Sequence, residues 1–120
     1  MKRIEIDVID PKLEQAALLA WAARVDAGEA QRPATPQLHF ASYRQLHATL
    51  TDKRMALLEH VALNEGLSIR QLAVQLARDY RNVYDDVQRL VQLGLIEIPD
   101  GKLHVPYDEI DIRKTLWEAV

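Results

Sequence analysis

A short segment of the chain carries four polar residues whose side chains can hydrogen-bond to the edges of nucleic-acid bases: Arg81, Asn82, Asp85 and Gln88. An arginine can donate two hydrogen bonds to guanine, and an asparagine or glutamine can form a similar pair with adenine. All four positions fall within two turns of a predicted helix, near the N-terminal end that usually enters the major groove of DNA. Two interpretations of Asp85 stay open, because its carboxylate can accept a hydrogen bond from cytosine or repel a phosphate.

Basic and hydroxyl-bearing side chains surround these four residues in the sequence. Tyrosine hydroxyls, guanidinium groups and the N-terminus of a preceding helix all donate hydrogen bonds to phosphate oxygens. The predicted DNA contacts therefore also include Ser68, Arg70, Arg78, Tyr80, Tyr84, Arg89 and Lys102. Asp86 is expected to turn back toward Arg89 or Arg70 as structural support. The alternative for this face is an ordinary solvent-exposed helix surface, and the order of the surrounding elements favours DNA binding.

Three predicted helices carry or support this face. Apolar residues recur at helical spacing in residues 52–63, 68–77 and 81–93, and Thr51 and Ser68 are suitable N-cap residues. The residues of the first helix that we expect to face the core are Met55, Leu58, Val61 and Ala62. In a helix-turn-helix the second helix of the pair lies in the major groove, so residues 81–93 are the predicted recognition helix.

A β-hairpin is predicted after the last of these helices. Residues 95–98 and 103–105 are largely apolar, and Pro99-Asp100-Gly101-Lys102 between them contains an Asp-Gly turn signal. Three helices followed by a hairpin is the order of a winged helix-turn-helix, and Lys102 at the hairpin tip would reach flanking DNA. The predicted fold class is therefore mainly α with a small β component.

The N-terminal part of the chain is predicted to form a strand-helix arm, residues 1–30, joined by a linker to a winged helix-turn-helix domain, residues 38–120. Ile4, Ile6 and Val8 alternate with acidic residues, as in a half-buried strand, and Asp10-Pro11 is a typical helix start. The helix that follows, to about Val25, is apolar almost all round, so we expect a homodimer or partner interface at Leu13, Ala17, Ala20 and Trp21. Packing within its own domain is the alternative. The strand at residues 4–8 can pair with a second predicted strand at 109–112, within the chain or across a dimer.

Composition excludes several classes of protein. The formal net charge of −3 rules out a general polybasic coat, and the absence of cysteine rules out disulfides, thiolate nucleophiles and zinc-thiolate sites. The longest apolar run, Ala16–Ala23, is far shorter than the roughly 20 residues of a membrane-spanning helix. The four histidines lack metal-ligand spacing, and neither a nucleophile elbow nor a phosphate loop is present. We expect a soluble, cytoplasmic protein that is not an enzyme and that has no metal or other cofactor.

The stretch from Leu67 to Val105, LSIRQLAVQLARDYRNVYDDVQRLVQLGLIEIPDGKLHV, resembles the winged helix-turn-helix of MarR-like regulators. The segments RDYRNVYDDVQRLVQLGLIE and VPYDEI are also similar to a family of small DNA-binding proteins whose members are often encoded beside a small toxin. This resemblance implies a transcriptional regulator, and as the alternative an antitoxin that neutralises a small toxin protein and autoregulates its operon. Residues 68–106 carry as many acidic as basic residues. A single copy should therefore bind double-stranded DNA weakly, which favours a dimer.

Overall fold

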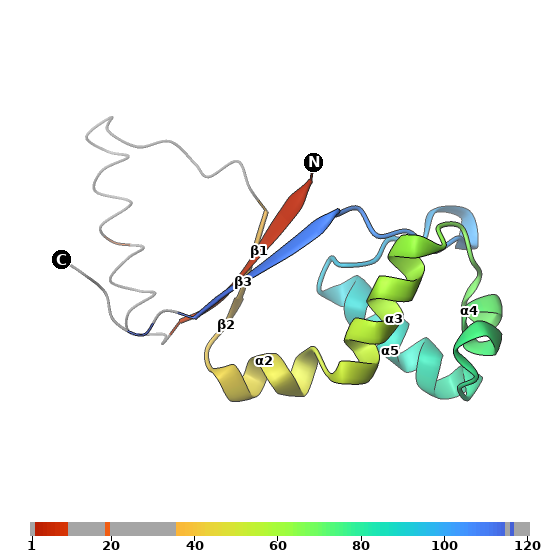
Figure 1. The fold of residues 1–120 in the computed structure, drawn as a ribbon, viewed down its shortest axis with the longest axis horizontal. Helices are drawn as coiled ribbons and strands as arrows, with labels where there is room; N and C mark the ends of the chain where they lie inside the picture. Colours follow the sequence, from red (N-terminus) through yellow and green to blue (C-terminus); the bar gives the residue numbers. More distant parts are fainter. Residues whose placement is uncertain (1, 10–18, 20–35, 115, 117–120) are drawn as a thin grey trace. The chain divides into compact units, whose positions relative to one another are not determined.

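The computed structural model describes residues 2–9, 19, 36–114 and 116, and this part of the chain contains four α-helices and a three-stranded sheet (Figure 1). The chain forms two compact units. The helical unit comprises Met1–Lys2 and Leu50–Asp108, and the sheet unit comprises Arg3–Thr49 and Glu109–Val120. The sequence predicted a different division, into an arm of residues 1–30 and a domain of residues 38–120. The observed units differ because strand pairing joins segments from both ends of the chain in the sheet unit.

Three helices make up most of the helical unit: α3 (Asp52–Leu63), α4 (Ile69–Leu76) and α5 (Tyr80–Gln92). The hydroxyl of Thr51 accepts a hydrogen bond from the backbone N–H of Arg54, at 3.2 Å. Ser68 forms a capping box with Gln71, in which each side chain bonds the backbone N–H of the other residue. Both predicted N-caps are confirmed, and the three helices end within a residue or two of their predicted positions.

The apolar faces of the three helices form the core of this unit together with the segment that follows α5. The buried apolar side chains of this unit are Leu50, Leu57, Leu58, Val61, Leu72, Ala73, Val83, Val87, Leu90, Leu95, Ile96, Leu103 and Val105. The predicted core face of α3 is only partly right, because Ala62 is exposed and Met55 is half-buried. The face that is buried runs through Leu57, Leu58 and Val61, which turns Ala62 and Leu63 to the surface.

The predicted hairpin is present in a short form. Glu97 and His104 form an isolated antiparallel bridge, with backbone hydrogen bonds of 2.8 and 2.9 Å in the two directions. A 3-10 turn, η1 (Pro99–Gly101), forms the tip. Leu103 pairs instead with the loop before α4, since its N–H donates to the carbonyl of Leu67 and its carbonyl accepts from Gly66. The hairpin is therefore held by the loop beside it as well as by the bridge between Glu97 and His104.

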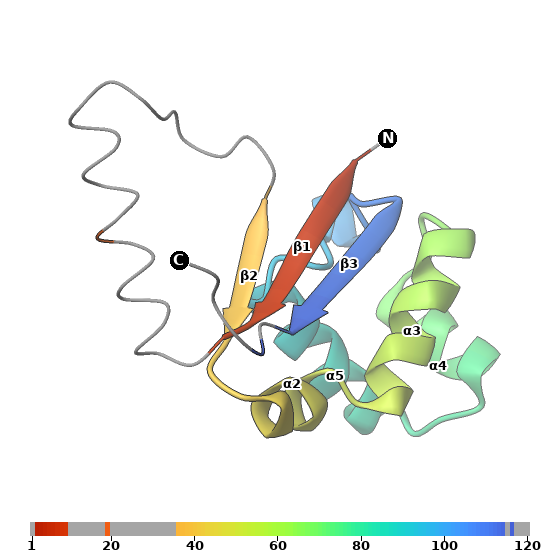
Figure 2. The same cartoon turned by 60° about the vertical axis from the view of Figure 1, so that its left-hand side comes forward.

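The sheet unit contains three parallel strands, β1 (Arg3–Val8), β2 (Gln37–Phe40) and β3 (Glu109–Lys114), with β1 in the centre (Figure 2). Ile4 pairs with Ile110 and Ile6 with Ile112, so the predicted pairing of these strands within the chain is confirmed. The short helix α2 (Tyr43–Thr49) follows β2. Parallel neighbours require long connections, which here bring the two ends of the chain into one sheet.

The predicted helix from Pro11 to Val25, with its interface residues Leu13, Ala17, Ala20 and Trp21, lies outside the described residues, apart from the single position Leu19. Most of the predicted linker lies outside them as well. Within the described part of the chain, no helix has the length and apolar character needed to cross a membrane.

Candidate nucleic-acid interface

A tight turn of three residues connects α4 to α5. Ala77 adopts the left-handed conformation, with φ of 54°, and the N–H of Arg78 donates to the carbonyl of Ala73. Asp79 then caps α5, because its carboxylate accepts a hydrogen bond of 2.8 Å from the backbone N–H of Arg81. These local bonds fix the direction in which α5 leaves α4, and with it the face that α5 presents to solvent.

The N-terminal half of α5 exposes the side chains that can bind base edges. Arg81 and Asp85 have side chains that are 82% and 62% exposed, and Asn82 is exposed as well. Gln88 is half-buried one turn further on. Arg81 Nε lies 3.8 Å from Asp85 Oδ1, an exposed pair of a kind that contributes little to stability and opens easily. The four residues therefore lie on the solvent side of α5, while Val83, Val87 and Leu90 face the core.

A stack of three side chains joins the beginning of α4 to the beginning of α5. The Arg70 guanidinium lies 5.1 Å from the centre of the Tyr80 ring, and the Tyr80 and Tyr84 rings are 6.1 Å apart. Both tyrosines are partly exposed. Stacking on an aromatic face restricts the orientations of a guanidinium while leaving its N–H groups available. Arg70, Tyr80 and Tyr84 are thus held beside the exposed face of α5, as a phosphate-binding role requires.

Arg78 lies apart from this face, and its interpretation as a DNA contact needs correction. Its Nη2 bonds Asp86 Oδ2 at 2.7 Å, and Arg54 Nε bonds the other carboxylate oxygen of Asp86 at 3.0 Å. All three side chains are at least 78% buried. Arg78 Nη1 is also buried, without a hydrogen-bond partner in the described structure. The group therefore connects α3, the turn and α5 inside the unit, and Arg78 is structural.

The ion pairs of Asp86 determine its protonation state. The structural role predicted for this residue is found, but its partners are Arg54 and Arg78 rather than Arg89 or Arg70. Burial by itself would raise the pKa of Asp86. The hydrogen bonds from Arg78 and Arg54, with their positive charges, outweigh burial and hold the pKa below its ordinary value. Asp86 is consequently ionised at neutral pH.

The remaining predicted contacts lie outside the N-terminal half of α5. Ser68 is half-buried and its hydroxyl accepts a bond from the Gln71 backbone, so it caps α4. Arg89 is exposed in the last turns of α5, where its Nη1 lies 3.3 Å from Gln92 Oε1. Lys102 is exposed next to the hairpin tip.

The contact that anchors the hairpin was not predicted from the sequence. His104 Nδ1 lies 2.6 Å from Glu65 Oε2, and the other oxygen of Glu65 accepts a bond from the backbone N–H of Val105. Glu65 belongs to the loop after α3, so this carboxylate joins that loop to the hairpin. In the described residues, no group of three or more His, Asp or Glu side chains is arranged to hold a metal ion.

A model of the family described as HVO_A0114 matches residues 49–112, which is just over half of the chain. The matched region runs from the residues before α3 through the hairpin and into β3. No curated protein and no solved structure matches the chain.

Proposed function

The chain belongs to the HVO_A0114 family, and we propose that it is a sequence-specific regulator that binds double-stranded DNA. In this proposal α3, α4, α5 and the short hairpin are a winged helix-turn-helix, with α5 as the recognition helix in the major groove. The observation that carries the proposal is the exposed N-terminal half of α5, where Arg81 and Asn82 stand on the side opposite the buried Val83 and Val87.

The two sets of side chains on this surface have different tasks in the proposed complex. Arg81, Asn82 and Gln88 read base edges, because these side chain types can form paired hydrogen bonds to guanine or adenine. Arg70 and the two stacked tyrosines bind the phosphate backbone and set the register of α5 in the groove. Lys102 contacts the flanking backbone from the hairpin.

The lack of net charge on the DNA-binding module favours binding as a dimer. Residues 68–106 have no net formal charge, so a single module gains little from phosphate neutralisation. Arg81 also forms an ion pair with Asp85, and this pair has to open before Arg81 can bind a base. A dimer that binds a two-fold-symmetric DNA site makes twice as many phosphate and base contacts as one copy. We therefore expect the regulator to bind its site as a dimer.

The proposed recognition face is tested by replacing Arg81 and Asn82 together with alanine. We expect the affinity of this variant for the protein's own upstream DNA, measured by fluorescence polarisation, to weaken by a factor of about 30 or more, since the variant loses two base contacts that each contribute roughly 1–3 kcal/mol. Lys53→Ala is the matched control, because it removes an exposed charge from α3 and leaves α5 intact. Unchanged affinity of the double variant, with its circular dichroism spectrum preserved, would contradict the proposal.

A further inference from the structure

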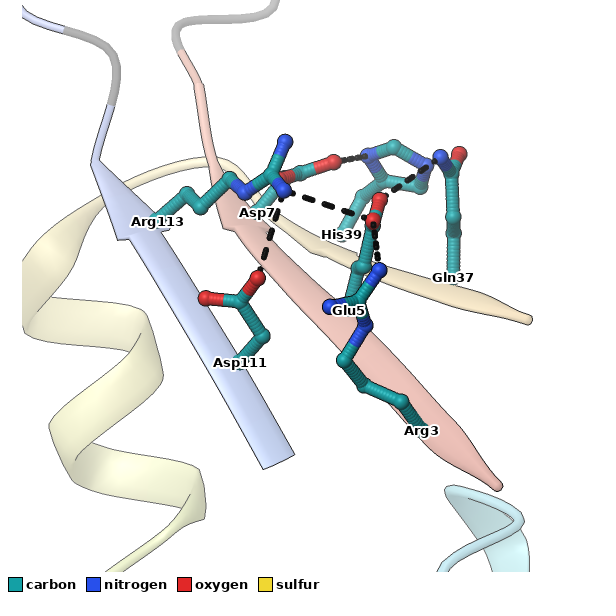
Figure 3. A network of polar contacts seen from close by, with 7 residues as sticks. All are labelled: Arg3, Glu5, Asp7, Gln37, His39, Asp111 and Arg113. Carbon is teal, nitrogen blue, oxygen red and sulfur yellow. Dashed lines mark hydrogen bonds and ion pairs between the residues drawn. The ribbon is translucent and has the colours of Figure 1, made fainter. Parts of the chain in front are cut away.

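One face of the sheet unit carries a connected group of polar side chains (Figure 3). At its centre is Glu5 of β1, whose side chain is only 13% exposed. Its carboxylate lies 3.2 Å from Gln37 Nε2 on one neighbouring strand and 3.4 Å from Arg113 Nη2 on the other. Arg113 also lies 3.2 Å from Asp111 of its own strand and is itself 56% exposed. The polar group therefore extends from the central strand to β3, where its most exposed charge is found.

β3 forms one end of the sheet in the described structure. It follows β1 in the strand order, and in the described part of the chain no strand pairs with its other side. Alternate residues of such a strand direct their backbone N–H and C=O groups outward, which is a template for another strand. β3 is six residues long, against four for β2 at the opposite end, and Ile112 near its middle is 49% exposed.

The charges of β3 are complementary to those of the same strand running in the opposite direction. If two copies pair about a two-fold axis at Ile112, Asp111 of each copy faces Arg113 of the other, and Ile112 faces itself. Opposite charges directly across a strand pair stabilise it, whereas like charges destabilise it. Centring the pair on Asp111 or on Arg113 would bring two like charges together. Centring it on Ile110 would place Glu109 opposite Asp111. The charge pattern thus selects one register.

We propose that β3 pairs with β3 of a second copy in this antiparallel register, joining two sheet units into one continuous six-stranded sheet. The interface is isologous, as a two-fold axis requires, and each Arg113 lies between Glu5 of its own copy and Asp111 of the other. A single pair of short strands buries less surface than a standard stable interface, so we expect a dissociation constant on the order of micromolar. This dimer requires no DNA, and the inference therefore goes beyond the proposed function.

Cysteine cross-linking tests the register directly, because the chain contains no cysteine of its own. At the proposed axis, two copies of Ile112→Cys have Cβ atoms roughly 5 Å apart, which suits a disulfide. Lys114→Cys is the matched control, since it lies on the same strand face but would be about 13 Å from its symmetry mate. We expect Ile112→Cys to form a linked dimer at least about tenfold faster than Lys114→Cys under mild oxidation. Equal rates would overturn the proposal.

Sedimentation analysis without DNA provides the second measurement, on the full chain. We expect Arg113→Ala to weaken dimerisation about tenfold, because it removes both cross-strand ion pairs. Arg44→Ala, which removes an exposed arginine from α2 of the same unit, should leave dimerisation unchanged. A chain that stays monomeric through high micromolar concentrations would overturn the proposal, as would a dimer that Arg113→Ala does not weaken. Neither result depends on whether α5 binds DNA.

Discussion

The helical unit and the sheet unit place their charged residues in different ways. In the helical unit, Asp86 is held between Arg54 and Arg78 within the fold, while the exposed side of α5 carries Arg81 and Asn82. In the sheet unit the charges lie together on one face, where Glu5 is surrounded by neighbours from both adjacent strands. The first unit thus uses buried charge to fix its helices, and it leaves exposed on α5 the polar side chains with which we propose that it binds DNA. Among the described residues of the second unit, the exposed charges largely pair with one another, and the charges along β3 are those that we propose a second copy matches.

The largest effect on stability is expected from the apolar side of the sheet unit. Ile6 is fully buried on the central strand, so Ile6→Ala should lower the free energy of unfolding by about 3 kcal/mol through lost burial and a residual cavity. Asp111→Asn, on the polar side of the same sheet, should change it only slightly, because its ion pair with Arg113 is partly solvated. Urea denaturation of the two variants measures the difference. A large loss for Asp111→Asn would contradict the description of this face.

The next largest effect is expected at the buried charge of the helical unit. Asp86→Asn leaves Arg54 and Arg78 without their carboxylate, and we expect it to lower the free energy of unfolding by about 2 kcal/mol. Asp85→Asn is the matched control, because it makes the same substitution on the exposed side of the same helix. Comparable losses for both variants in urea denaturation would show that the Asp86 group has no special structural role.

The same group should make stability depend on pH. The pKa of Asp86 is lower in the folded chain than its ordinary value of 3.8, so its ion pairs stabilise the fold above that value. This contribution is lost as pH falls through the lowered pKa. We therefore expect the difference in unfolding free energy between the native chain and Asp86→Asn to be constant near neutral pH and to shrink below about pH 4. A difference that stays constant into strong acid would contradict this assignment.

The smallest effect is a gain in stability at the turn between α4 and α5. Ala77 has a φ of 54°, a conformation that disfavours residues with a Cβ atom. Ala77→Gly should therefore raise the free energy of unfolding, by up to about 1 kcal/mol, without altering the direction of α5. Thermal denaturation measures the gain. A loss of stability would indicate that the flexibility of glycine in the unfolded chain outweighs the strain at this position.

Local features of the fold were predictable from the sequence, and long-range pairings were much less so. The N-caps at Thr51 and Ser68 depend on neighbours three residues away, so their sequence signals are direct. Alternation also indicated β1 and β3, but their parallel register depends on a connection of about a hundred residues, which no local pattern specifies. The hairpin was predicted with more pairing than it has, because the Asp-Gly signal does not report the competing bonds of Leu103 to Gly66 and Leu67.

In the candidate site, too, local features were predictable from the sequence and long-range contacts were not. The exposed face of α5 was predictable, because buried and exposed positions alternate with the helical period in this segment. Arg78 was assigned to that face because it precedes α5 in the sequence. Its partner Asp86 and the third member, Arg54, come together only in the folded unit, since Arg54 lies 32 residues before Asp86. Residue type and spacing cannot distinguish a phosphate-binding arginine of a turn from one that holds a buried carboxylate.

The proposed reading of a DNA duplex by α5 can be tested by titrating the intact protein with two duplexes at two salt concentrations. One duplex carries the protein's own upstream region, and the other has the same base composition in shuffled order. We predict at least about tenfold tighter binding to the upstream duplex, with affinity for both falling as salt rises. Equal affinity for the two duplexes, or no salt-dependent binding to either, would contradict recognition of a DNA sequence by α5.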